Sequence, residues 1–487
     1  MDIKAALSER LGRLTTAAQR RGIRAPRVLS GPLRAVFHRG ISNSADLDDW
    51  SRPLIGEAPP AALAHAAEPP AAGQLPAVGP AAVGPPAAGP AGPQLLRCVL
   101  VTGSLDVGGM EEVVTLLARL LPGEGFVTSV LHALAVPEAG PAPLGRLGVL
   151  LATQHHLTVA ALGENEGRRW LEAQAPDVIS GHGAPQWALD WACERGVPYV
   201  DTLHGTPHMD EIDWPAEVPR SQSLAGVIAV SDIVRRQYLT GNPGFPAEKC
   251  RIVTNCVDET RRQPADRDRT RAELGLTNEY LFVCLARFSL QKNVYALVDA
   301  FGELAGAFAN VHLLIAGRPD DPLYLRQTRL LRDQLGPRDR IHLRDHVTDP
   351  GRLLAAGDGF VLDSFFEGGQ LVSMEALYAG TPVVLSEAGA AMDQVGGRNT
   401  SRGIVVPNPL GDPLKATWDQ MRATRFSRQA NRPELIDAMS TLVHRRRDWA
   451  AMRAELAAES ASRFGQAATV RGHAQALSSA ARTGSIA

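Results

Sequence analysis

The chain has 487 residues, of which 45% are hydrophobic and 21% charged, and its formal net charge is −2 at pH 7. This length allows two or three domains. The near-neutral charge excludes bulk attraction to nucleic acid, and no apolar run reaches the roughly 18 residues of a membrane span. Five cysteines without C-x-x-C spacing support neither a disulfide framework nor a zinc site. We therefore expect a cytoplasmic protein.

Residues 1–57 are expected to form a basic, partly helical extension. Apolar residues recur at helical spacing from Ile3 to Ala18, and residues 1–40 carry nine Lys or Arg against two Asp or Glu, 9 − 2 = +7. Such a helix can bind peripherally to an anionic inner membrane face through residues 1–40. A solvated helix and a partner-binding arm are the alternatives, because the first 35 residues contain no aromatic anchor.

Residues 58–94 are nearly all Ala, Pro and Gly. A segment of this composition cannot bury a core, so we predict a disordered or semi-extended linker. The motifs described below lie at or beyond Gly108, and residues 1–94 are therefore expected to be dispensable for the chemistry.

Residues 95–260 are predicted to be a first α/β domain of Rossmann-like type. Several of its strand patterns are continuous apolar runs, which are typical of parallel strands buried on both faces. The expected strands are residues 98–102, 126–131, 178–180, 199–203, 227–230 and 252–254, and a helix is expected over 187–194.

A second Rossmann-like domain is predicted over residues 261–465, after a linker near 258–279. Its strands are expected at residues 280–286, 311–316, 341–343, 360–362, 383–385 and 404–406, and its helices at 294–304, 323–335, 352–355 and 371–378. Beyond Pro407 the chain is rich in arginine and then mostly helical.

The most informative stretch follows the strand at 360–362. Glu367 precedes a Gly368-Gly369 turn, and Glu375 lies eight residues later inside a predicted helix. The glycines let backbone N–H groups approach a ligand at a helix N-terminus, where the dipole favours an anion. A nucleotide sugar needs a phosphate site beside a carboxylate that accepts hydrogen bonds from a diol. The alternative is that both glutamates are solvated and have no function.

Arg287 and Lys292 form an R-x4-K pair where the first strand of the second domain ends. Two cations at the carboxyl edge of a sheet suit a diphosphate. Ordinary surface cations are the alternative, but this edge is expected to face the same cleft as Glu367.

Two features of the first domain also fall at strand ends. The backbone at Gly108-Gly109 can approach a phosphate or a sugar. Residues 103–108 (GSLDVG) lack the G-x-G-x-x-G spacing of a dinucleotide-binding loop, which argues against an oxidoreductase. His204 ends a strand beside Gly205 and can face the cleft, or it can be a loop histidine bonded to backbone. His182 is a weaker candidate.

The D-x-D pairs Asp46–Asp48 and Asp266–Asp268 do not follow buried strands and are interpreted as solvated charge. We predict no metal and no cofactor.

The motifs together make residues 97–480 resemble a retaining glycosyltransferase of the GT-B architecture, close to glycosyltransferase family 4 (glycosyl transferases group 1). The first 94 residues lie outside this resemblance. The matching pieces, in chain order, are Gly108-Gly109-Met110-Glu111, Leu203-His204-Gly205, Val230-Ser231, Asn255-Cys256-Val257-Asp258, Ala286-Arg287, Gln291-Lys292-Asn293, Ala316-Gly317, Glu367 to Glu375 and Gly380-Thr381-Pro382-Val383-Val384.

The resemblance implies a UDP-sugar or GDP-sugar donor in the cleft between the domains and a glycan, lipid-linked or secondary-metabolite acceptor. The final helix, residues 466–487, would cross back to the first domain. By resemblance, Glu375 would hold the ribose hydroxyls, and Arg287 and Lys292 the diphosphate. Glu367 and the amides of Gly368, Gly369, Gln370 and Leu371 would position the sugar, which His204 would approach from the first domain. Gly108 and Gly109 are expected to contact the donor as well.

Three departures from the family pattern stand out. Gly369-Gln370 occupies the place of a common aromatic residue, Asn255-Cys256 replaces a common Asn-Gly, and the Arg-rich residues 413–432 resemble an insertion. Two rival functions are a nucleotide-sugar epimerase of the same architecture and a non-catalytic partner that binds a nucleotide sugar. The presence of Glu367, Arg287 and Lys292 favours transfer.

Overall fold

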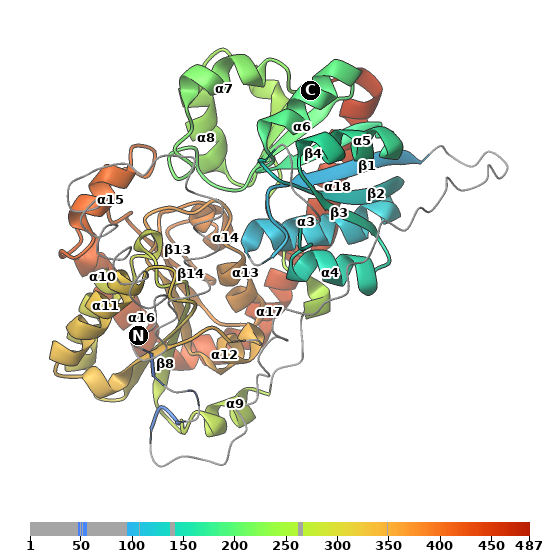
Figure 1. The fold of residues 1–487 in the computed structure, drawn as a ribbon. Coiled ribbons are helices and arrows are strands. Elements are labelled where there is room, and N and C mark those ends of the chain that lie inside the picture. Colours follow the sequence, from blue (N-terminus) through green and yellow to red (C-terminus); the bar gives the residue numbers. More distant parts are fainter. Residues whose placement is uncertain are drawn as a thin grey trace, which may run out of the picture.

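The computed structural model describes residues 47–48, 50, 52–55, 95–106, 108–136, 142–261, 266–347 and 349–487. The predicted basic helix, the linker of residues 58–94 and Asp46 lie outside these residues. The described chain forms two α/β units, shown as separate lobes in Figure 1.

The first unit contains a parallel seven-stranded sheet in the order β3-β2-β1-β4-β5-β6-β7 within the described residues. Its strands are β1 Leu96–Thr102, β2 Phe126–Ala133, β3 Thr158–Leu162, β4 Val178–His182, β5 Tyr199–Leu203, β6 Gly226–Ala229 and β7 Cys250–Ile252. Its helices are α3 Gly109–Leu120, η3 Leu121–Glu124, α4 Arg146–Thr153, α5 Glu164–Gln174, α6 Gln186–Arg195, α7 Trp214–Ser221, α8 Asp232–Gly241, η4 Ala247–Lys249 and η5 Glu259–Arg261.

Two strands of this unit differ from the expectation. The strand predicted at 252–254 ends at Ile252, and β3 was not predicted. β3 is an edge strand that is mostly half-buried, so its sequence lacks the continuous apolar run of a central strand.

The second unit has a seven-stranded sheet in the order β10-β9-β8-β11-β12-β14-β13, in which only the described β13–β14 pair is antiparallel. Its strands are β8 Tyr280–Leu285, β9 Val311–Ala316, β10 Ile341–Arg344, β11 Gly359–Leu362, β12 Val383–Ser386, β13 Asn399–Thr400 and β14 Gly403–Val406. Its helices are α9 Arg267–Glu273, η6 Leu290–Lys292, α10 Val294–Ala307, α11 Pro322–Gln334, η7 Arg338–Arg340, α12 Pro350–Ala356, α13 Leu371–Tyr378, α14 Ala391–Val395, α15 Trp418–Thr424, α16 Arg432–His444 and α17 Arg446–Arg463.

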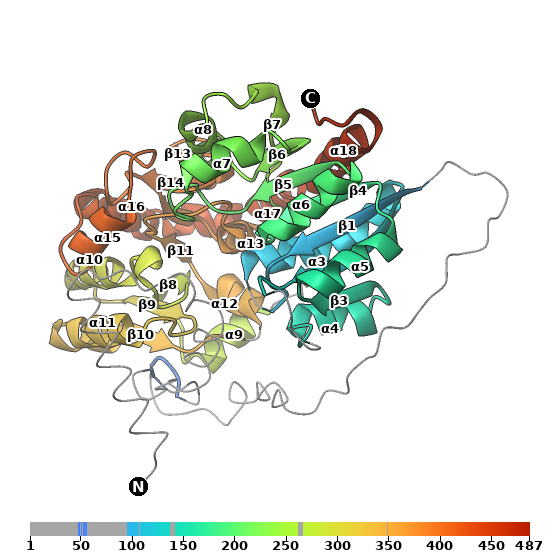
Figure 2. The same cartoon turned by 45° about the horizontal axis from the view of Figure 1, so that its top comes forward.

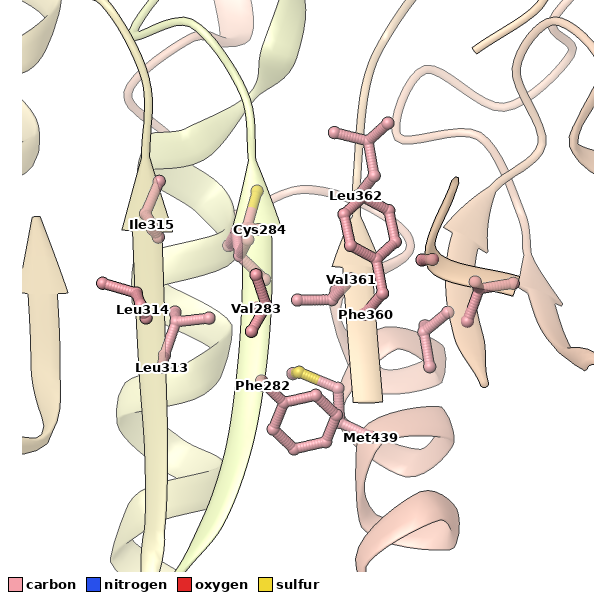
Figure 3. Packing of buried hydrophobic residues seen from close by; sticks show 14 of the residues in the cluster. Phe282, Val283, Cys284, Leu313, Leu314, Ile315, Phe360, Val361, Leu362 and Met439 are labelled. Carbon is pink, nitrogen blue, oxygen red and sulfur yellow. The ribbon is translucent and has the colours of Figure 1, made fainter. Parts of the chain in front are cut away.

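The core of the second unit consists of the apolar runs that predicted its strands. Residues 282–284, 313–315 and 360–362 of β8, β9 and β11 lie side by side and are at most 2% exposed, with Met439 of α16 packed against them (Figure 3). Burial on both faces explains why these strands are continuously apolar rather than alternating.

The last helix, α18 (Gln466–Thr483), returns to the first unit. Its Val470, Leu477 and Ala480 join the core that contains Cys98 and Val178. The return of this helix confirms the expected GT-B arrangement, with α18 lying behind the first sheet (Figure 1).

A buried carboxylate anchors α9 to the second sheet. Asp358, 8% exposed, accepts hydrogen bonds from Arg267 (2.6 Å), Arg271 (3.0 Å) and the amide of Leu281 (2.9 Å). A buried charge is stable only when it is paired in this way. Residues 267–279, predicted to be linker, are therefore part of the second unit.

The short described segment before the linker also packs on the second unit. The Asp48 amide donates to Leu343 O (2.7 Å), and its carboxylate accepts from the Leu343 amide (2.9 Å) and from Arg332 (2.8 Å), beside the edge strand β10 (Figure 2). The interpretation of Asp48 as a solvated charge is wrong, because this carboxylate caps the sheet edge.

Leu54 completes the attachment of this segment. Its side chain is 8% exposed within the core of the second unit, and its amide donates to Leu274 O (2.8 Å). Trp50 Nε1 donates to Asp345 O (3.1 Å). The described residues 47–48, 50 and 52–55 thus contribute to the second unit.

We predict that Leu54→Ala lowers the free energy of unfolding by about 2 kcal/mol, because it removes a largely buried leucine side chain. Urea denaturation measures this change. Leu95→Ala is the matched control, since Leu95 is 52% exposed. Equal denaturation midpoints for Leu54→Ala and the control would show that the 47–55 segment does not stabilise the second unit.

Candidate functional site

The loops that follow β5, β8 and β11 meet at the carboxyl ends of the two sheets, where open parallel sheets bind ligands. The Gly-Gly turn of the second unit touches the first unit there: a Cβ on Gly368 would overlap the carbonyl oxygen of His204. Asn255 Nδ2 donates to Gly369 O (2.9 Å). The structure therefore brings Glu367 and its glycine turn against His204.

Glu367 and Lys292 form an ion pair at the centre of this region. Lys292 Nζ lies 2.6 Å from Glu367 Oε1, and the two side chains are 15% and 8% exposed. Lys292 ends η6, and the left-handed backbone of Asn293 (φ 51°) turns the chain into α10. The pair joins the R-x4-K motif to the E-x7-E motif.

Arg287 lies nearer the solvent, with 48% of its side chain exposed. Its Nη1 donates to Asp320 Oδ2 (2.6 Å) and its Nη2 to Gln291 Oε1 (3.3 Å). Asp320 follows β9 and was not among the residues singled out from the sequence. The one sequence signal for Asp320 was its position shortly after the strand that ends at Ala316, because that strand end lies at the same edge of the sheet as the end of β11.

Gln370 is turned towards the protein. Its Nε2 donates to Ala388 O (2.9 Å) and its Oε1 accepts from the Ala390 amide (3.0 Å), while its carbonyl accepts from Gln394 Nε2 (2.9 Å) and Ser373 Oγ (3.0 Å). The side chain and the carbonyl of Gln370 thus bond to protein atoms, and its backbone N–H is the group that can face a donor. This network holds the glycine turn rigidly at the start of α13.

The amino ends of α3 and α13 come close together. Leu371 packs against Gly109, and Glu375 is half-buried on the next turn of α13. The carboxylate of Glu111 lies over Gly108, and Glu112 is also in the first turn of α3. Because these acids already complement the helix dipole, the α3 end is better suited to hydroxyl groups than to a phosphate.

His204 belongs to a short chain of polar side chains. Its Nε2 lies 2.8 Å from His182 Nδ1, and His182 Nε2 lies 3.0 Å from Ser180 Oγ. Burial, with a smaller contribution from the neighbouring His473 imidazole, lowers the pKa of His204 to about 3. Burial and the two neighbouring imidazoles also hold the pKa of His182 well below its usual value. Both rings are neutral at physiological pH, so His204 can donate or accept a hydrogen bond but carries no charge.

Asp363, directly after β11, is a buried carboxylate that links three loops. It is 1% exposed and accepts from Asn293 Nδ2 (2.9 Å) and Asn431 Nδ2 (2.8 Å). Burial raises its pKa to about 7. Since Asn293 follows Lys292, this carboxylate fixes the R-x4-K loop beside the E-x7-E loop.

The Arg-rich residues 413–432, which the sequence suggests to be an insertion, pack between the two units. Their α15 covers Phe365 and Phe366, and the Trp418 ring lies 5.8 Å from the Phe366 ring. Trp418 Nε1 donates to Met209 O (2.8 Å), and His208 Nδ1 lies 3.0 Å from Ala416 O. The insertion therefore bridges the loop that carries Glu367 and the first-unit loop after His204.

Among the residues that the structure describes, no helix is long and apolar enough to cross a membrane. In the same residues, no three His, Cys, Asp or Glu side chains gather as metal ligands.

Comparison with known families identifies both units. Residues 107–261 match the family model "Glycosyltransferase Family 4", and residues 266–448 match "Glycosyl transferases group 1". A phosphatidyl-myo-inositol mannosyltransferase of Mycobacterium leprae is 28% identical over 304 residues, covering 59% of this chain and 77% of the relative. A D-inositol 3-phosphate glycosyltransferase of Rhodococcus opacus is 27% identical over 326 residues, covering 59% and 72%.

Solved structures share the fold. The Anabaena protein Alr3699/HepE, in complex with UDP-glucose, superposes with a TM-score of 0.61 at 20% identity, covering 79% of this chain and all of that chain. A glycosyltransferase of Rickettsia africae superposes with a TM-score of 0.63 at 14% identity, covering 80% and 100%.

The buried carboxyl group of Asp363 predicts a pH-dependent stability. Its pKa rises from 3.8 to about 7 on folding. The stabilisation is therefore complete below the unfolded value and is lost as the pH rises through the folded value. We expect the free energy of unfolding of the wild type to fall between pH 4 and pH 7 relative to Asp363→Asn, measured by urea denaturation.

The control for this experiment is Asp419→Asn, because the Asp419 side chain is 88% exposed. Its pH profile should follow that of the wild type. Parallel profiles of the wild type and Asp363→Asn would contradict the assignment of a protonated Asp363.

Proposed function

Because the chain belongs to glycosyltransferase family 4 and is a nucleotide-sugar glycosyltransferase, we propose that it transfers the sugar of a UDP-sugar or GDP-sugar to a hydroxyl group with retention of anomeric configuration. Residues 95–260 are the acceptor side and residues 261–465 the donor side. The observation that carries the proposal is the Lys292–Glu367 ion pair, whose glutamate directly precedes a glycine, Gly368, that lies against the backbone of His204.

Arg287 and Lys292 neutralise the leaving diphosphate in this proposal. Both cations lie at the carboxyl edge of the second sheet, and a protein acid already holds each of them in place, Asp320 for Arg287 and Glu367 for Lys292. Fixed positive groups aimed at the place where negative charge develops stabilise a transition state. Two such groups supply the charge that a divalent metal supplies elsewhere, so we propose a metal-independent reaction.

Glu367 and the backbone amides of Gly368 to Leu371 hold the donor sugar, and Glu375 holds the ribose hydroxyls. The bond from the anomeric carbon to the diphosphate oxygen breaks, and the acceptor oxygen bonds to the same face of that carbon. The acceptor proton passes to the departing diphosphate. Neutral His204 contributes a hydrogen bond at the sugar, which suits a reacting centre that becomes positive.

The acceptor is proposed to be a polyol, glycan or lipid-linked hydroxyl compound. Support comes from the acidic end of α3, where Glu111 covers Gly108. The two inositol-directed relatives named above also support a polyol. The complex of HepE with UDP-glucose likewise supports a UDP-sugar donor. Peripheral binding of residues 1–40 to a membrane stays a prediction.

Incubation with a panel of UDP-sugars and GDP-sugars tests the reaction. We expect release of the nucleoside diphosphate from at least one donor, unchanged in EDTA because protein cations carry the charge. Conversion to an epimeric nucleotide sugar would identify an epimerase, and binding without release a non-catalytic partner. Loss of activity in EDTA with recovery in Mg²⁺ or Mn²⁺ would contradict metal independence.

The two glutamates should have separable effects. Glu375→Ala should weaken binding of the free nucleoside diphosphate by about 1–3 kcal/mol, since one charged hydrogen-bonding partner is lost. Glu367→Ala should not weaken that binding, because it leaves Lys292 without its ion-pair partner and available to the diphosphate. It should lower kcat at saturating donor, because the contacts of Glu367 with the sugar strengthen in the transition state. Calorimetric titration and steady-state kinetics measure the two effects.

Glu434→Ala serves as the control, because Glu434 is an exposed glutamate in the first turn of α16. It should change neither binding nor kcat. Loss of diphosphate binding in Glu367→Ala but not in Glu375→Ala would reverse the assigned roles.

A further inference from the structure

Gln291 lies between the two cations of the R-x4-K motif, in η6, and its amide group bonds in three directions. Nε2 donates to Phe366 O (2.9 Å) and towards Met209 Sδ (3.3 Å), and Oε1 accepts from Arg287 Nη2 (3.3 Å). The Gln291 carbonyl also accepts from the Phe365 amide (3.0 Å). Donors meet acceptors in every contact, so one orientation of the amide satisfies all three.

These partners belong to three different parts of the site. Phe366 directly precedes Glu367, and Arg287 is the cation at the mouth of the site. Met209 belongs to the first-unit loop that follows His204. The Gln291 side chain therefore connects the loop that carries Glu367, the Arg287 guanidinium and the first unit.

The distance between Arg287 and Glu367 matters for the reaction. Negative charge grows on the diphosphate while positive charge grows at the anomeric carbon, and each needs its own partner at the right place. A misplacement of about 1 Å in such groups can cost roughly a hundredfold in rate. The Lys292 ion pair restrains the Glu367 side chain, whereas Gln291 restrains the backbone that carries it.

We propose that Gln291 is a positioning residue that sets Arg287 and Glu367 relative to each other and couples both to the first unit through Met209. The inference rests on the proposed function, in which those two side chains act on the donor. Gln291 itself need not touch the donor, because protein atoms already occupy both of its N–H groups and one lone pair of its side-chain oxygen.

Two substitutions separate the contacts of Gln291. Gln291→Met keeps the length and packing but removes all three hydrogen bonds of the side chain. We expect a fall in kcat of about tenfold or more, with the donor KM, the diphosphate Kd and the Tm close to those of the wild type. Gln291→Glu keeps the acceptor near Arg287 but adds a negative charge that competes for it, so the diphosphate Kd should rise about tenfold.

A double variant distinguishes positioning from a general structural loss. If Gln291 acts through Glu367, Gln291→Met should lower kcat by less than about twofold in a Glu367→Gln background. A merely structural effect would lower kcat by the same factor in both backgrounds. Gln334→Met is the matched control for the substitution: this glutamine is exposed at the end of α11, and its replacement should leave kcat unchanged.

The outcomes separate this inference from the proposed function. An active wild type with an equally active Gln291→Met overturns the inference alone. A wild type that binds a nucleoside diphosphate but transfers no sugar overturns the proposed function, and the Gln291→Glu titration then decides the inference: an unchanged Kd overturns it. Equal kcat losses for Gln291→Met in both backgrounds also overturn it.

Discussion

The ion pair between Lys292 and Glu367 is the interaction on which the site depends. It joins the loop after β8 to the loop after β11, two strands that are neighbours in the second sheet. Near this ion pair, the Asp363 carboxylate accepts a hydrogen bond from Asn293. The Gln370 side chain bonds the glycine turn to residues 388–390. A largely buried pair of opposite charges is costly to break, because either ion left alone would be unpaired in a poorly solvated place. The R-x4-K and E-x7-E motifs therefore behave as one rigid structure.

Contact between the two units adds a second constraint. The glycine turn can meet His204 only because Gly368 has no side chain. The units are also joined by α18, which packs in the core of the first unit, and by Trp418, which bonds to Met209 of the first unit. The neutral state of His204 follows from the same close packing, since burial opposes its protonation. The site therefore has fixed cations on the second unit and uncharged or acidic groups on the first unit.

Residues outside the family pattern contribute to the same structure. The segment 47–55 completes the core of the second unit through Leu54 and occupies the edge of β10 through Asp48. The insertion covers Phe366 and reaches Met209 through Trp418. The sequence could not reveal the role of Asp48, because an aspartate that bonds to a sheet edge and a solvated aspartate can stand in the same sequence context.

Much of the fold was predictable from the chain itself. Central parallel strands are apolar along their whole length, so β1, β8, β9 and β11 were recognisable. The Gly368-Gly369 turn placed Glu367 at a strand end, and the apolar run of residues 280–286 placed Arg287 and Lys292 at another. The edge strand β3 was missed, because half-burial weakens that signal. The sequence by itself determined the fold class, the two motifs and the family. Only the tertiary structure decided that Lys292 pairs with Glu367, that the Gln370 side chain faces the protein, and that Gln291, Met209, Asp320 and His473 belong near the site. Such contacts join residues up to hundreds of positions apart, and local pattern carries no information about distance in space.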